Sequence, residues 1–364
     1  MTEQEALLVL NAVPDLGARR IRKLMAFWGS ALKVLGASVP ELNSSGLVSS
    51  DTAENIFHFS KDKFLQGEYN SMKHKGIVAT TAIDKDYPGV LNDFEDAPVV
   101  LYIKGDIGSL NQKSVALVGS RLASFYGLST AKAFASAFVH SGLVVVSGLA
   151  RGIDTAAHQG SLEAGGSTIA VIGCGFDHIY PKENYSLMET ISRNGAVISE
   201  FACAMPPLKH NFPWRNRIIS GLSSVLVVIE AGSKSGALIT AGYALAQNKD
   251  VFVLPSNIDN ERALGSNQLI QEGALVALSP DDVLSRIKEG YIPFNTIDRR
   301  TLPWLSDEQS KLYSCITCQP VHLDELAAHS GFSVSSLMNI LLSMELKHLI
   351  RQLPGQYYVR NEHV

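Results

Sequence analysis

The most chemically suggestive stretch of the sequence is residues 209–217, Lys-His-Asn-Phe-Pro-Trp-Arg-Asn-Arg, which combines three fixed cations with two aromatic rings. No aspartate or glutamate occurs between Glu200 and Glu230, so nothing nearby in sequence neutralises these cations. A cation can screen a phosphate, and an aromatic ring can stack on an unpaired base. The segment therefore favours contact with single-stranded nucleic acid. In the alternative interpretation, Phe212 and Trp214 are core anchors and the arginines pair with acids elsewhere.

The chain as a whole does not have the composition of a nucleic-acid coat. Its formal net charge is −4 and its pI is near 6.2, so any nucleic-acid binding must come from a local basic patch. Its 364 residues are enough for two or three domains. It has four cysteines, an acidic start where a signal peptide would be basic, and no apolar run near the roughly 18 residues of a membrane-spanning helix. We therefore expect a soluble, cytoplasmic protein with no membrane partner.

Between residues 113 and 287, strand and helix patterns alternate regularly. The strand candidates are almost entirely apolar, as parallel strands covered on both faces must be. They are Ser114–Val118, Leu143–Ser147, Ser167–Ile172, Gly195–Ser199, Ser224–Ile229 and Asp250–Leu254. Helical periodicity fills the intervals, for example at residues 128–140 and 155–164. This alternation predicts an α/β domain with a Rossmann-type doubly wound parallel sheet.

Residues 1–75 have the pattern of short helices, which predicts a small helical domain of the helix-hairpin-helix or SAM-like kind. A turn at residues 14–18 (Pro-Asp-Leu-Gly-Ala) precedes a helix rich in arginine and lysine. In a helix-hairpin-helix, backbone amides at such a turn meet a DNA phosphate. A packing or dimerisation domain explains the pattern equally well. Residues 76–112 are extended and turn-rich, and we expect them to add one or two strands to the edge of the next domain.

The C-terminal part begins with a polar, Pro-containing linker at residues 288–303. Residues 304–364 then show three helical segments and a hairpin around Pro354-Gly355, which predicts a winged-helix domain. The third helix follows Ser333, a natural N-cap, and has no cation before Lys347. Because this helix would normally enter a major groove, its neutrality favours protein contact over reading of duplex DNA.

Glycine or small polar residues follow five of the predicted strands. At the carboxyl edge of an open α/β sheet, such turns let a backbone approach a phosphate, whose charge the helix N-termini favour. Arg121 and Arg151 belong to the same rim, so the turns indicate an anion site. They match neither a dinucleotide fingerprint nor a Walker A sequence, and we expect no cofactor. The turns are residues 118–121, 147–154, 172–177, 230–236 and 255–257.

Several residues at this rim raise the question of catalysis. Asp154 and His158 are one helical turn apart and could transfer protons, but a helix cap and a packed histidine explain them better. Cys174 could be a nucleophile, although a small apolar role is commoner. Cys315 and Cys318 form a lone C-x-x-C without a second ligand pair, so we expect no zinc site. We therefore expect neither a catalytic residue nor a metal.

Taken together, these segments resemble the DNA-processing protein A family (DprA, also called Smf). The resemblance covers the whole central domain, about half of the chain. The residues that carry it are 119–121, 147–154, 180–184, 199–200, 212–222, 230–231, 235–236 and 267–270. The family implies a non-enzymatic protein of natural transformation, which binds and protects incoming single-stranded DNA and helps to load RecA recombinase for homologous recombination.

The resemblance also implies roles for individual residues. The phosphate clamps would be Arg121, Lys182 and Lys209. Phe212 would stack on a base. The residues that bring backbone close to the strand would be Gly119, Ser120 and Gly148. The residues that either brace the loop or touch the strand would be Arg215, Asn216 and Arg217. The family further implies a homodimer, and the apolar positions that could line its interface are Leu245, Ile270 and Val276, although core packing explains them nearly as well.

Two other functions compete with this one. The sheet also resembles the lysine-decarboxylase-like nucleotide hydrolases, whose Gly-Gly-x-Gly-Thr-x-x-Glu turn carries a catalytic glutamate. Here the corresponding turn, residues 231–240, is followed by no acid before Asp250, which argues against hydrolysis. The other alternative is a regulator that reads duplex DNA through its winged helix, and the neutral third helix argues against it.

Overall fold

The computed structural model describes residues 1–288, 305–317, 319–347 and 349–360 of the chain. Two compact units make up these residues: a large one with the N-terminal helices and the main sheet, and a small C-terminal one. Nearly all of the predicted 288–303 linker lies outside the described residues, as does Cys318 of the C-x-x-C pair. No helix in the described ranges combines the length and the apolar composition needed to span a membrane.

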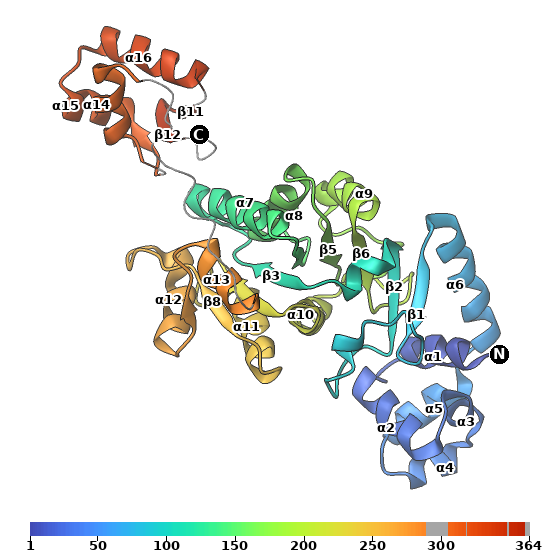
Figure 1. Ribbon diagram of the computed structural model, residues 1–364. Coiled ribbons are helices and arrows are strands. Elements are labelled where there is room, and N and C mark those ends of the chain that lie inside the picture. Colours follow the sequence, from blue (N-terminus) through green and yellow to red (C-terminus); the bar gives the residue numbers. More distant parts are fainter. Residues whose placement is uncertain (289–304, 318, 348, 361–364) are drawn as a thin grey trace. The chain divides into compact units, whose positions relative to one another are not determined.

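The large unit is built on a nine-stranded sheet with the order β1-β2-β6-β5-β4-β3-β7-β8-β9 (Figure 1). From β6 to β9 in this order the neighbours are parallel, while β1 and β2 pair antiparallel at one edge. The strands are β1 Val78–Thr81, β2 Val100–Gly105, β3 Ser114–Val118, β4 Val144–Ser147, β5 Thr168–Val171, β6 Ala196–Ser199, β7 Val225–Val228, β8 Val251–Val253 and β9 Leu275–Val276. The predicted Rossmann-type sheet is confirmed, and residues 76–112 supply its edge strands β1 and β2.

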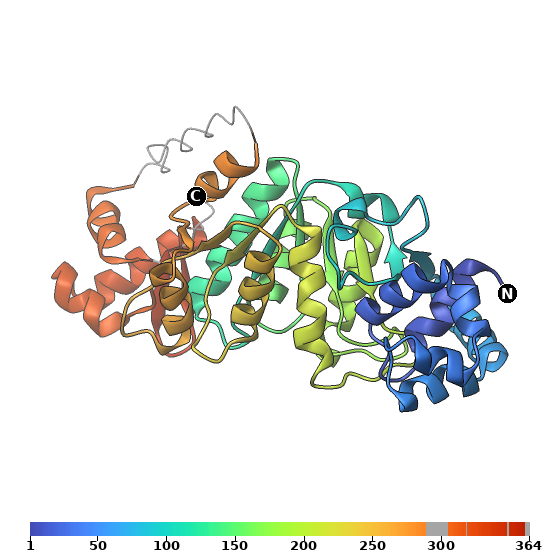
Figure 2. The same cartoon turned by 90° about the horizontal axis from the view of Figure 1, so that it is seen from below.

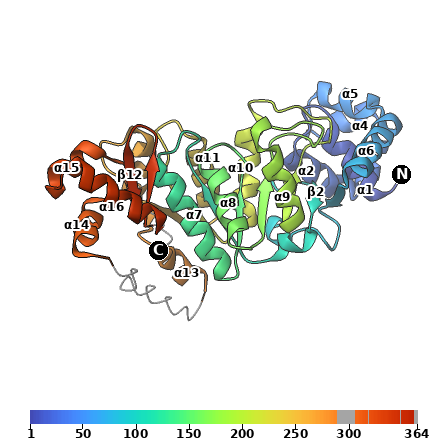
Figure 3. The ribbon, with the colours of Figure 1, turned by 90° about the horizontal axis from the view of Figure 1, so that it is seen from above.

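Helices cover both faces of this sheet, which is why its central strands are buried along their whole length. Figure 3 shows α7, α8 and α9 side by side on one face, and Figure 2 shows the yellow-green helix α10 running across the other. The helices are α7 Phe125–His140, α8 Ile153–Glu163, α9 Tyr185–Asn194, α10 Asn211–Leu222, α11 Gly236–Ala246, α12 Leu264–Gln271 and α13 Pro280–Ile287. The strand order reverses direction between β3 and β7, so the sheet has its topological switch point there, where open α/β sheets bind ligands.

Six helices precede the sheet: α1 Glu3–Ala12, α2 Ala18–Trp28, α3 Ala31–Gly36, α4 Val39–Ser44, α5 Ser50–His58 and α6 Lys61–Lys75. They do not form a core of their own, because one hydrophobic cluster runs from Leu7 and Ile56 to Tyr102 and Ala170 of the sheet. The helices are therefore anchored to the β1–β2 edge. A boundary near residue 75 and a DNA-binding hairpin both stay predictions.

The small unit is a winged helix, as the sequence predicted. Its elements are α14 Asp307–Cys315, β10 Val321–His322, α15 Leu323–Ser330, α16 Val334–Leu346, β11 Ile350–Leu353 and β12 Tyr357–Arg360, with strand order β10-β12-β11. Ser333 caps α16 by accepting a hydrogen bond from the Ser336 amide. The outer side of α16 is apolar and exposes Val334, Met338, Leu342 and Leu346.

Candidate nucleic-acid interface

A cleft of about 510 Å³ opens at the carboxyl ends of β3 and β7, at the switch point of the sheet. The turn after β3 contributes Gly119, Ser120 and Arg121 to its lining, and the N-terminal turn of α10 contributes Phe212. Phe212, Arg121 and the glycine turns thus lie on one edge of the sheet. We call this the first cleft.

The ring of Phe212 is a half-buried shelf in the first cleft. A Cβ on Gly173 would lie 2.8 Å from its Cδ1 atom, so the ring rests directly on the bare backbone of the β5–α9 loop. The ring of Tyr180 lies 5.1 Å from it, centroid to centroid, and the Arg121 guanidinium lies 5.8 Å from its centroid. Only glycine at position 173 permits this position of the ring, and the part of the ring that lines the first cleft is accessible to a ligand.

Three predicted phosphate ligands share a condition that suits anion binding. Arg121, Lys182 and Lys209 are exposed, and none of them forms an ion pair with another described residue. Lys209 lies two residues before α10, between Pro207 of the second cleft and Phe212 of the first, although it lines neither cleft itself. Lys182 lies in a second cleft, of about 740 Å³, whose lining includes Tyr180. The contact between Tyr180 and Phe212 joins the two clefts.

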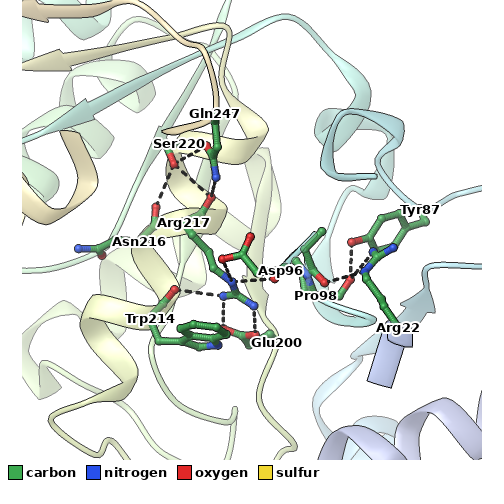
Figure 4. A network of polar contacts seen from close by, with 11 residues as sticks. Arg22, Tyr87, Asp96, Pro98, Glu200, Trp214, Asn216, Arg217, Ser220 and Gln247 are labelled. Atoms are coloured by element: carbon green, nitrogen blue, oxygen red, sulfur yellow. Dashed lines mark hydrogen bonds and ion pairs between the residues drawn. The ribbon is translucent and has the colours of Figure 1, made fainter. Parts of the chain in front are cut away.

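Arg217 has a different environment, shown in Figure 4. Its side chain is 1% exposed, and its two terminal nitrogens donate to the Glu200 carboxylate at 2.7 and 2.6 Å. Its Nε donates to the Asp96 carbonyl, and the Trp214 ring lies 4.1 Å from the guanidinium. Burial acts to lower the pKa of Arg217, but Glu200 and Asp96 outweigh it and leave that pKa raised. Of the two roles considered for Arg217, this geometry supports bracing α10.

Arg215 is also buried and donates to the carbonyls of Gly148 and Val171. Burial lowers its pKa to about 10, against the opposing effect of Asp154. A Cβ on Gly148 would lie 2.7 Å from both the Arg215 guanidinium and the Asp154 carboxylate. Gly148 is therefore needed for internal packing, and the structure does not bring it to the surface of the first cleft.

Asn216 completes this support and lies at the wall of the first cleft. Its Oδ1 accepts from Arg215 Nε at 3.2 Å, and its Nδ2 donates to the Gly236 carbonyl at 3.2 Å. It thereby ties α10 to the start of α11. The segment 209–217 thus begins with exposed residues outside the lining of both clefts, reaches the first cleft at Phe212, and ends with buried residues that hold α10 in place.

The residues considered for catalysis are occupied elsewhere. His158 is fully buried beside Thr168, and burial lowers its pKa to about 3. Burial raises the pKa of Asp154 and raises that of Cys174 to about 11, so Cys174 stays a thiol at neutral pH. Glu230 is buried and accepts a hydrogen bond from Asn260 at 3.1 Å. Within the described ranges, no group of three His, Cys, Asp or Glu side chains could hold a metal ion.

The sequence reasoning missed three residues of these clefts. Lys234, in the loop between β7 and α11, is exposed at the first cleft. Tyr180 and Tyr185 are 45% and 50% exposed and line the second. Lys234 could have been found by placing the predicted fifth strand beside the first at the switch point. The tyrosines flank Lys182 in a segment already singled out, where two aromatics around a lysine were the available signal.

Comparison with known proteins supports the same interpretation. Residues 78–288 match the model of the DNA recombination-mediator protein A family, and residues 298–356 match the DprA winged helix domain. The chain is 36% identical over 281 residues to protein Smf of Escherichia coli, which covers 74% of each chain. It resembles the X-ray structure of DNA processing protein A from Streptococcus pneumoniae with a TM-score of 0.69 and 36% identity, covering 79% of this chain and 99% of that one.

A second similar structure is that of DNA processing protein A from Helicobacter pylori, which is described by its single-stranded DNA binding mode. It matches with a TM-score of 0.54 and 30% identity, over 58% of this chain and 96% of that chain. The family model alone covers more than half of the sequence and spans the whole sheet that carries both clefts. The chain belongs to the DNA recombination-mediator protein A family.

Proposed function

We propose that this protein binds single-stranded DNA in natural transformation, protects the incoming strand and helps to load RecA recombinase on it. One observation carries the proposal: exposed cations without ion-pair partners among the described residues border the half-buried ring of Phe212 on one edge of the sheet. The cations can neutralise phosphates, and the ring can stack on a base. Because a paired base has no free face to offer, this combination favours an unpaired strand.

Burial of the remaining arginines supports the proposal. Arg215 and Arg217 hold α10 from within, so the helix start that carries Phe212 is fixed before a ligand arrives. A fixed site loses little conformational entropy on binding. The relatives add support, since one of them is described by its single-stranded DNA binding mode and the family by recombination mediation.

The direct test is the affinity of the full chain for single-stranded and duplex DNA of equal length, measured across a range of salt concentrations. We expect tighter binding to the single strand, with an affinity that falls as salt rises. Equal affinity for both forms would contradict the proposal. The rate of RecA assembly on single-stranded DNA, with and without this protein, tests the loading role separately.

Homodimer formation is a further part of the proposal. Leu245 on α11 and Val276 on the edge strand β9 are 58% and 40% exposed, while Ile270 on α12 is partly buried against the core. Pairing of two copies would double the number of phosphate contacts along one strand. Sedimentation of the protein and of a Leu245→Glu, Val276→Glu variant tests this, and an unchanged mass would contradict the assigned face.

The two competing functions have weaker support. A hydrolase needs a carboxylate able to act on substrate, whereas Glu230 is buried and already accepts a hydrogen bond. Release of base from AMP, lost on Glu230→Gln, would favour the hydrolase. For the winged helix we propose protein contact, because α16 exposes apolar side chains where a duplex reader needs cations. Sequence-specific duplex binding that depends on α16 would overturn that view.

A further inference from the structure

The second cleft is lined by two tyrosine rings, Tyr180 and Tyr185, to which the proposed function assigns no role. Tyr180 and Tyr185 stand in the segment that leads from β5 into α9, and both rings are about half exposed. Lys182 lies between them in sequence and lines the same cleft. The first cleft has a similar pairing, in which the half-buried Phe212 ring lies beside the exposed Arg121.

The two clefts form one aromatic path. The Tyr180 ring lies 5.1 Å from the Phe212 ring and is tilted 51° to it. Phe212 lines the first cleft and Tyr180 lines the second. A strand whose base stacks on Phe212 therefore meets Tyr180 next, without crossing a stretch of surface that lacks rings.

The charges around the second cleft leave it open to a phosphate. Its two carboxylates are already neutralised, since Glu183 pairs with Arg151 and Asp177 pairs with Lys75 at 2.5 Å. Lys182, in contrast, forms no ion pair with any described residue. The cleft therefore offers one uncompensated cation beside its tyrosines.

The segment that carries these side chains is held rigidly. Asn184 is buried and donates from Nδ2 to the Leu149 carbonyl and to Thr155 Oγ1, each at 2.9 Å. These bonds fasten the start of α9 to the β4–α8 loop and to the first turn of α8. The rings are thus positioned before a ligand arrives, so little conformational entropy is lost in ordering them on binding.

We propose that the second cleft is a base-stacking subsite, in which Tyr180 and Tyr185 hold unpaired bases and Lys182 binds the adjoining phosphate of the same strand. This inference rests on the proposed function and extends the binding path beyond Phe212. Stacking on an aromatic ring depends little on the identity of the base, so the subsite should accept any sequence.

The test uses fluorescently labelled oligothymidylates of about 4 to 16 nucleotides, the range of site sizes known for single-strand binding folds. Tyr180→Ala and Tyr185→Ala should each weaken binding of the long oligonucleotides by about 5- to 150-fold, with the salt slope unchanged. Binding of the shortest oligonucleotides, which fill only the first cleft, should change less. Tyr180→Phe keeps a stacking face and should bind like the unmodified protein.

The controls separate this inference from the proposed function. Tyr69 is 43% exposed on α6 and lines neither cleft, so Tyr69→Ala should bind as the unmodified protein does. If both tyrosine variants bind long oligonucleotides normally while Phe212→Ala is weakened, the subsite is wrong and the proposed function stands. If Phe212→Ala also binds normally, the proposed function itself is wrong. Thermal unfolding of each variant shows whether it is folded, and Tyr185 makes no ring contact with other described residues, so its variant is the less disruptive.

Discussion

The guanidinium of Arg121 lies 5.8 Å from the centre of the Phe212 ring, although the two residues come from different connections of the sheet. Arg121 lies in the loop after β3, and Phe212 lies in the first turn of α10, which packs on the face of the sheet opposite to α7, α8 and α9. The sheet thus brings the proposed phosphate ligand and the proposed stacking ring close enough together to contact the same nucleotide. Arg121 alone could bind any anion, and Phe212 alone could stack on any flat ring. Together they favour a ligand that has both a phosphate and an unpaired base.

Removal of a phosphate ligand should change the salt dependence of binding. For Arg121→Ala and for Lys209→Ala, we expect the slope of log affinity against log salt to become less steep by about 0.7 for each phosphate of a single strand that the variant no longer neutralises. Lys63→Ala is the control, because Lys63 is exposed and its helix α6 contributes no residue to either cleft, whereas Lys209 lies between Pro207 of the second cleft and Phe212 of the first. If both Arg121→Ala and Lys209→Ala show the salt slope of the unmodified protein, these side chains do not bind phosphate.

The seat of Phe212 gives a second prediction. Phe212→Ala should cost roughly 1–3 kcal/mol of binding with an unchanged salt slope, because the ring contributes stacking and no charge. Gly173→Ala should also weaken binding although it removes no group, since the new Cβ would lie 2.8 Å from the ring and displace it. Gly242→Ala on α11 is the matched control, because nothing lies within 4 Å of its added Cβ. Normal binding by Gly173→Ala would mean that the ring position does not matter.

Loss of Arg217 should affect folding more than the salt slope. Arg217→Ala leaves Glu200 buried without its partner, which typically costs about 3–5 kcal/mol, so we expect unfolding in urea at a lower concentration. The double variant Arg217→Met, Glu200→Leu removes both charges and should recover part of this stability. Tryptophan fluorescence can follow the unfolding. A stable Arg217→Ala with a flatter salt slope would instead make Arg217 a phosphate ligand.

Buried His158 should make the fold sensitive to acid. Burial lowers its pKa from 6.5 to about 3. Between these pH values the unfolded chain binds a proton at His158 and the folded chain does not. Above pH 6.5 His158 is mostly neutral in both states, so it changes the free energy of unfolding little. As the pH falls from 6.5 towards 3, protonation of the unfolded chain lowers that free energy. Between about pH 7 and pH 5 we expect it to contribute a decrease of about 2 kcal/mol in the free energy of unfolding.

That contribution can be isolated by mutation. His158→Phe should reduce the change in unfolding free energy between about pH 7 and pH 5, whatever its effect at neutral pH. His74→Gln, at an exposed position of α6, should leave the pH dependence as it is. If His158→Phe keeps the full pH dependence, then His158 is protonated in the folded protein.

The sheet could be predicted from the sequence because its strands are short, apolar and covered on both faces. Each predicted parallel strand coincides with an observed one to within a residue or two. The helix at 211–222 was harder, since Pro213 and the polar residues 215–217 hide its periodicity; proline is tolerated there because it lies in the first turn, where amides have no helical partner. The shared core of the N-terminal helices was also invisible, because a local pattern does not show what a helix packs against.

Only part of the site could be predicted, because a local sequence pattern does not show which residues from elsewhere in the fold surround it. Composition identified the basic segment, but it could not separate Lys209 from Arg217, because exposure depends on Glu200 and Asp96 from other parts of the fold. Gly148 looked like a surface turn and is instead covered by Arg215. Charge type can be read along a chain, whereas the partner of each charge is set by tertiary structure.

The network around Arg217 has a consequence for the N-terminal helices. Asn11 donates to the Glu200 carbonyl at 2.7 Å, and Arg22 donates to the Ala97 carbonyl, beside the Asp96 that meets Arg217. The helices α1 and α2 thereby stabilise the polar network around Arg217, which holds the helix α10 that carries Phe212. A shortened chain that began at residue 76 would lack this support, and we expect it to bind single-stranded DNA more weakly although both clefts keep all their lining residues.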